Sequence, residues 1–131
     1  MEGLLRLFFR SMLLDPAHER SMQLLRANLT PCQLRQFETC SYFDVVGGTT
    51  GHIYRIHRGE ARNIDEQDDA GAWIYTWCFL PMGRLAEGDV LLAQKVALES
   101  FELEARAVGV RTSRPSPPSS IFFNFGRTSR P

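Results

Sequence analysis

The sequence predicts a small α+β domain with N-terminal helices, a four-stranded antiparallel β-meander and a C-terminal helix packed on the sheet. Three features predict this fold class. Residues 42–80 contain four short runs rich in β-branched and aromatic residues, separated by glycine-containing turns. Helix-start signals precede this region, and a long amphipathic stripe follows it over residues 90–108. A chain of 131 residues also favours a single domain.

The first two helices of the domain are predicted from their start signals. Asp15 precedes Pro16, so its carboxylate can accept hydrogen bonds from the free amides of a helix that we expect to reach Asn28. Thr30 and Gln33 have the spacing of a capping box. A second helix should therefore begin after a bend near Thr30.

An apolar segment, residues 1–14, precedes these helices and is expected to be helical. Arg6 and Arg10 interrupt it and no small-residue cleavage site follows, so it does not match a signal peptide. It could dock on the core, extend from the domain without order, or touch a membrane or a partner. No apolar run in the sequence approaches the ~20 residues of a transmembrane segment.

The predicted meander alternates apolar and polar residues in its first three strands. A loop that contains Gly47, Gly48 and Gly51 joins the first two strands. Gly59 and Glu60 have the pattern of a two-residue hairpin turn. The strands are expected at residues 42–46, 53–58, 61–66 and 73–79.

The C-terminal helix is expected to begin after Asp89 as its N-cap and to run to about Val108. Gly109 should end it with a left-handed residue. Two pairs at i,i+4 spacing are expected on its outer side: Lys95 with Glu99, and Glu102 with Arg106.

Residues 110–131 differ in composition from the rest of the chain. Their prolines and serines favour a disordered tail. The pentapeptide Arg-Thr-Ser-Arg-Pro occurs at 111–115 and at 127–131, and the apolar run Ile-Phe-Phe-Asn-Phe lies between them at 121–125. This arrangement is either an extension without a role or a linear docking motif. The single α+β domain is accordingly expected to span residues 15–109.

The charge and cysteine content limit the classes of function that the protein can have. Residues 110–131 contain four arginines and no acidic residue, so the rest of this formally neutral chain has a net charge of −4. An acidic body argues against a general nucleic-acid binder. Three widely spaced cysteines indicate reduced thiols in a cytoplasmic protein, not a disulfide framework.

Several short strings between residues 20 and 108 form a specific pattern. It includes Leu29-Thr30-Pro31, Tyr42-Phe43-Asp44-Val45, Thr50-Gly51, Tyr54-Arg55-Ile56, Gly59, Asn63-Ile64, Cys78, Pro81 and Gly88 to Lys95. The pattern resembles a family of short, uncharacterised bacterial proteins, some of them phage-like. The resemblance implies one compact bacterial domain and implies no activity.

No metal or catalytic motif is recognised. Cys40, His52, His57 and Cys78 are the only plausible metal-ligating set, and they lack the paired spacing of structural zinc ligands. Cys78 and His57 with Asp44 or Asp65 could form a nucleophilic trio, but most chains of this length offer one. The glycine-rich loop at 47–51 lacks the lysine and the following helix of a phosphate-binding loop. We expect no cofactor, no metal and no catalytic residue.

The outer face of the meander is the candidate binding surface. The fourth strand is apolar on both faces, so one face is surplus to the core unless something covers it. Cys78, with other apolar residues, is expected to face the helices, and cationic and aromatic residues to face outward. The candidate binding residues are Arg55, His57, Trp73, Tyr75 and Trp77.

These residues predict a non-enzymatic interaction module that binds a protein partner or a second copy of itself. An alternative is a nucleic-acid-binding domain that uses the same face and the basic tail. A third is a small enzyme with an unrecognised site. A purely structural alternative is that helices cover the sheet on both sides and the aromatic residues belong to the core.

Overall fold

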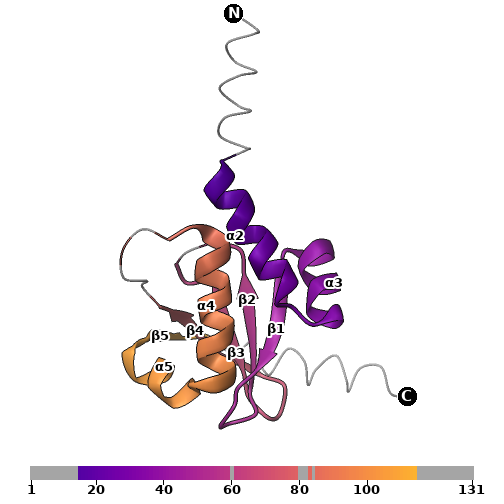
Figure 1. The fold of residues 1–131 in the computed structure, drawn as a ribbon. Helices are drawn as coiled ribbons and strands as arrows, with labels where there is room; N and C mark the ends of the chain where they lie inside the picture. Colours follow the sequence, from indigo (N-terminus) through magenta and orange to yellow (C-terminus); the bar gives the residue numbers. More distant parts are fainter. Residues whose placement is uncertain (1–14, 60, 80–82, 84, 115–131) are drawn as a thin grey trace, which may run out of the picture.

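The computed structural model describes residues 15–59, 61–79, 83 and 85–114 (Figure 1). The apolar segment 1–14 and the tail from residue 115 lie outside the described residues. The fold is α+β, as the sequence predicts. The helices are α2 (Pro16–Ala27), α3 (Pro31–Cys40), α4 (Glu87–Ser100) and α5 (Glu102–Val108). The strands are β1 (Tyr42–Val46), β2 (Ile53–His57), β3 (Ile64–Gln67), β4 (Trp73–Cys78) and β5 (Val110–Ser113).

The sheet has five strands in the order β1-β2-β3-β4-β5, and all neighbours are antiparallel. The predicted meander corresponds to β1–β4. The fifth strand was expected to be the start of the tail, and it pairs with β4 from Val110 opposite Cys78 to Ser113 opposite Tyr75. Its four residues are all exposed, so no apolar pattern marked it as a strand. The sheet therefore continues past Gly109, where the domain was expected to end.

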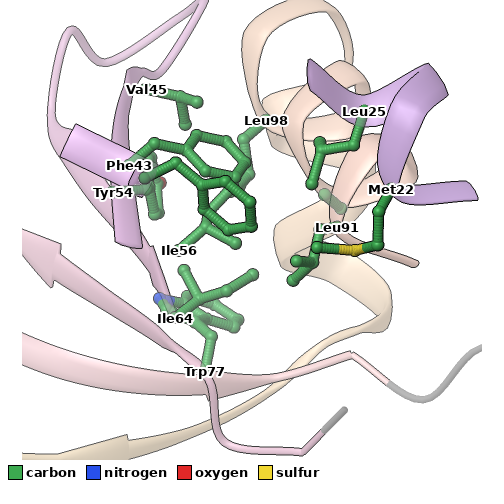
Figure 2. Packing of buried hydrophobic residues seen from close by; sticks show 12 residues of the cluster. Met22, Leu25, Phe43, Val45, Tyr54, Ile56, Ile64, Trp77, Leu91 and Leu98 are labelled. Carbon is green, nitrogen blue, oxygen red and sulfur yellow. The ribbon is translucent and has the colours of Figure 1, made fainter. Parts of the chain in front are cut away.

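The core lies between one face of the sheet and the crossed helices α2 and α4 (Figure 2). Met22 and Leu25 of α2 and Leu91 and Leu98 of α4 are at most 2% exposed. They face the buried strand residues Phe43, Tyr54, Ile56, Ile64 and Trp77 (Figure 2). Burial of these apolar side chains is the main stabilising contribution to the fold. The opposite face of the sheet is called the open face below.

Helix α3 covers the outer edge of β1. The Asp44 amide donates to the Gln36 Oε1 at 2.9 Å, and the Asp44 carbonyl accepts from the Gln33 Nε2 at 3.0 Å. Two glutamine side chains therefore occupy backbone groups that an added strand would need. This edge is closed to strand addition at Asp44.

Both predicted N-terminal caps are present. The Asp15 Oδ1 accepts from the Ala17 amide at 3.1 Å, and Thr30 and Gln33 form the reciprocal capping box. The chain bends between the two helices as expected, because α2 ends at Ala27.

The C-terminal helix differs from the prediction. It begins at Glu87 instead of after Asp89, and it is broken at Phe101, which has φ −138° and ψ 43°. Gly109 has φ −77° and is not left-handed. Glycine is needed here because there is no room for a side chain: a Cβ would lie 2.3 Å from the Phe79 Cε1 and 2.9 Å from the Trp77 Cε3.

The link between β2 and β3 is longer than the predicted two-residue turn. Strand β3 begins only at Ile64, and the residue before it, Asn63, is buried. Its side-chain amide donates to the His57 carbonyl at 3.0 Å and to the Gln94 Oε1 at 2.8 Å.

Candidate functional site

The predicted binding residues are divided between the two faces of the sheet. The β3–β4 pairing shifts register between Glu66 and Gln67, so that Glu66 lies opposite Tyr75 whereas Gln67 lies opposite Trp73. This bulge interrupts the alternation along β4. The prediction that Trp73, Tyr75 and Trp77 share an outer face is therefore wrong. Only Trp73 lies on the open face.

Trp77 is a core residue on the helix-covered face. It is 1% exposed, its ring stacks on Phe79 with centroids 5.5 Å apart, and its indole N–H donates to the Glu66 Oε1 at 2.8 Å. Tyr75 is half-buried against the same core, beside Arg111, whose guanidinium carbon lies 4.3 Å from the Tyr75 ring centroid. Cys78 was expected to be buried and to face the helices, but it is half-buried and follows Trp77 on β4, so that alternation turns it to the opposite face.

Arg55, His57 and Trp73 do come together on the open face. They belong to a set that follows one cross-strand row, in which Asp44 pairs with Arg55, Arg55 with Asp65, and Asp65 with Thr76. We call this set the open-face cluster: Tyr42, Asp44, Arg55, His57, Asp65, Trp73, Thr76 and Arg114.

Arg55 is the centre of the open-face cluster. Its Nε and Nη2 donate to the two carboxylate oxygens of Asp44 at 2.9 and 3.1 Å. The guanidinium carbon lies 4.0 Å from the Tyr42 ring centroid and 4.9 Å from that of Trp73. The hydrogen bonds that Arg55 donates to Asp44 raise the pKa of Arg55 above its already high value. The guanidinium is thus fixed between two aromatic rings by a bidentate ion pair.

Asp65 organises the second half of the cluster. One oxygen accepts from the Thr76 hydroxyl at 2.8 Å. The other lies 3.1 Å from both the His57 Nε2 and the Arg114 Nη1. Arg114 also approaches the Trp73 ring, 5.9 Å from its centroid. The cluster therefore links β1 to the residue after β5.

The side chains of the cluster are ordered but accessible. Arg55 is 29% exposed, His57 40% and Arg114 39%. Sequence reasoning missed Tyr42, Asp44 and Asp65, although Asp44 and Asp65 both lie opposite Arg55 on the neighbouring strands. It missed Arg114 because that residue was assigned to the tail.

A second polar cluster is buried beneath the other face. Glu66 is fully buried and accepts from the His52 Nδ1 at 2.6 Å and from the Arg106 Nη1 at 2.8 Å, besides the Trp77 indole. Arg106 also donates to the Tyr54 hydroxyl at 2.8 Å. These contacts attach α5 to the sheet.

Glu102 extends this buried cluster to the loop between β1 and β2. Its carboxylate, in a residue that is 1% exposed, accepts from the amides of Thr49 and Thr50 at 2.9 and 2.8 Å and from the Tyr54 hydroxyl. Burial raises the pKa of Glu102, but the hydrogen bonds from Thr50 and Tyr54 outweigh it and hold the pKa below its usual value. Burial also raises the pKa of Tyr54.

Two predictions are settled by this cluster. The i,i+4 pair of Glu102 and Arg106 was expected on the outer side of the helix, but both side chains point inward. The amides of Thr49 and Thr50 are occupied by Glu102, which agrees with the interpretation of residues 47–51 as a connecting loop. Because Glu66 and Glu102 have almost no exposed surface, the cluster is built as a structural attachment.

The remaining constellations do not assemble a site in the described part of the chain. Cys40 is exposed and Cys78 half-buried, and no group of three histidine, cysteine or acidic residues there could hold a metal ion. Among those same residues, no helix has the length and apolar character to cross a bilayer. Neither a family model, nor a curated protein, nor a solved structure matches this chain.

Proposed function

We propose that the protein is a small interaction module that binds a protein partner, or a second copy of itself, through the open-face cluster. The observation that carries this proposal is the position of Arg55 between Tyr42 and Trp73, where Asp44 fixes it. Tyrosine, tryptophan and arginine are the residues that most often supply binding energy at protein interfaces.

The cluster needs little reorganisation to bind. Its side chains are held by ion pairs and hydrogen bonds before any partner arrives, which lowers the entropy lost on association. Their partial exposure leaves the ring and guanidinium surfaces available. A partner that covers Trp73 and Arg55 would also exclude water from the Asp44 ion pair and strengthen it.

A protein partner is favoured over nucleic acid by the charge of the cluster. Arg55 pairs with Asp44, and Arg114 pairs with Asp65, so each guanidinium already has a carboxylate on the same face. Nucleic-acid binding depends on surplus positive charge that neutralises phosphates. The cluster offers little such charge.

The proposal is tested with two substitutions on the open face, Arg55→Ala and Trp73→Ser, and one elsewhere. Leu103→Ser is the matched control, because Leu103 is 56% exposed on α5. Self-association is measured by sedimentation velocity, and partner binding by quantitative mass spectrometry of affinity-purified complexes. We expect both face variants to lose association and the control to keep it. Association that survives both face variants would contradict the proposal, and a salt-dependent shift of labelled single-stranded DNA would favour the nucleic-acid alternative.

A further inference from the structure

An apolar cavity of about 200 Å³ lies between α4, α5 and the end of β4, away from the open face. Its wall contains Val90 and Ala97 of α4, Ala105 and Val108 of α5, and Phe79 after β4. Gln94 is the polar residue of the wall, and its amide is already engaged by reciprocal hydrogen bonds with Asn63 at 2.8 and 3.1 Å. The cavity therefore offers a ligand apolar contacts, while the Gln94 amide is engaged by Asn63.

The size of the cavity suits one aromatic ring. An apolar cavity of about 150 Å³ is large enough to hold benzene. Alanines on both helices leave this space open, where longer side chains would fill it. The rim is apolar as well, since Val108 is 82% exposed and Leu85 44% exposed. Exposed apolar surface around an apolar hollow favours the docking of an apolar side chain.

We propose that this cavity receives a phenylalanine ring from residues 121–125 of the same chain. That segment, Ile-Phe-Phe-Asn-Phe, contains three phenylalanines. The chain that leads to this segment passes the rim, because β5 starts two residues after Val108. Tethering gives the segment an effective concentration on the order of millimolar, so weak apolar contact is enough to dock it.

The length of the connection matches the distance. Six residues lead from Val108 to Arg114, which at ~3.3 Å per strand residue is about 20 Å. Eight residues lead back from Arg114 to Phe122, and an extended proline-rich chain covers ~3.1 Å per residue, or about 25 Å in total. Phe122 and the residues after it can therefore reach the rim, whereas Pro115 to Ser120 serve as the connection.

The test uses the full chain and methyl NMR of Val90, Ala97 and Ala105, whose methyl groups lie in the wall of the cavity. A docked ring shifts these methyl resonances by its ring current. The triple substitution Phe122→Ser, Phe123→Ser and Phe125→Ser should move all three sets of resonances, and the control Asn124→Ser should leave them in place. Benzene added to the triple variant should shift the same resonances, whereas the unsubstituted chain should respond at least several-fold less.

Three results would overturn the proposal. The first is that the triple variant and the unsubstituted chain have the same methyl spectrum and the same response to benzene. The second is that Met82→Ser, a change between the cavity-lining residues Phe79 and Leu85 in the sequence, moves the resonances and the triple variant does not. The third is that the difference between the triple variant and the unsubstituted chain disappears on dilution, which would assign the ring to a second copy.

Discussion

Replacing Trp77 with serine should destabilise the protein far more than the same replacement of Trp73, which lies four residues earlier on the same strand. Trp77 is 1% exposed, so its loss leaves a large cavity in the core. Truncation of a buried tryptophan costs about 3–5 kcal/mol. The Glu66 carboxylate also loses the indole donor at 2.8 Å, and a hydrogen bond to a charged group contributes about 1.5–3 kcal/mol.

The total for Trp77→Ser is therefore about 5 kcal/mol or more, comparable with the whole stability of a small domain. Trp73 is half-buried and loses mainly its contacts with Arg55 and Arg114, about 0.5–1 kcal/mol each. Urea unfolding followed by far-ultraviolet circular dichroism measures both values. We expect Trp77→Ser to be largely unfolded without urea and Trp73→Ser to unfold at a slightly lower urea midpoint. Equal losses, or a larger loss for Trp73→Ser, would refute the division of the two indoles between the faces.

Three further predictions concern the scaffold. Gly88→Ala should cost about 1–3 kcal/mol of stability by overpacking, because a Cβ there would lie 2.3 Å from backbone atoms of Ser21 where α4 crosses α2. Thermal melting checks this, with Val96→Ala as the control at an exposed site, which should stay within ~0.5 kcal/mol of the parent. A chain that ends at Gly109 should melt below one that ends at Arg114, because it lacks β5; equal melting temperatures would show that the strand contributes nothing. The pKa of Glu102 is lowered in the fold, so its contribution to stability is present above the ordinary carboxyl pKa and is lost as pH falls through the folded pKa. Glu102→Gln should therefore reduce the free energy of unfolding at pH 7 and make it fall less steeply with pH in urea titrations from pH 7 to 3.

The two N-terminal helices and the first four strands follow from local patterns that the sequence displays. Asp15 and Thr30 are caps whose chemistry acts within a few residues, so the helix starts were predictable. Strand β5 was not, because its polar residues are ordered by pairing with β4 and not by their own burial. The break at Phe101 likewise depends on contacts that turn Glu102 inward to Tyr54 and Thr50.

The candidate site was only partly predictable for a related reason. Arg55, His57 and Trp73 were placed correctly on one face by alternation. Tyr75 and Trp77 were not, because the β-bulge between Glu66 and Gln67 changes which residues of β4 share a face. A bulge depends on the pairing of two strands, and the hydrophobic pattern of one strand does not reveal it.

Contact between the open face and another protein in the cell is the most direct test of the proposed interface. A photoreactive amino acid at Thr112, an exposed residue opposite Thr76 on the open face, measures this contact in living cells. The same amino acid at Leu103, 56% exposed on α5, is the control. We predict a discrete cross-linked protein from position 112 that Trp73→Ser abolishes, and no such product from position 103. Cross-links of equal yield at both positions, or a product at 112 that is insensitive to Trp73→Ser, would contradict the proposed interface.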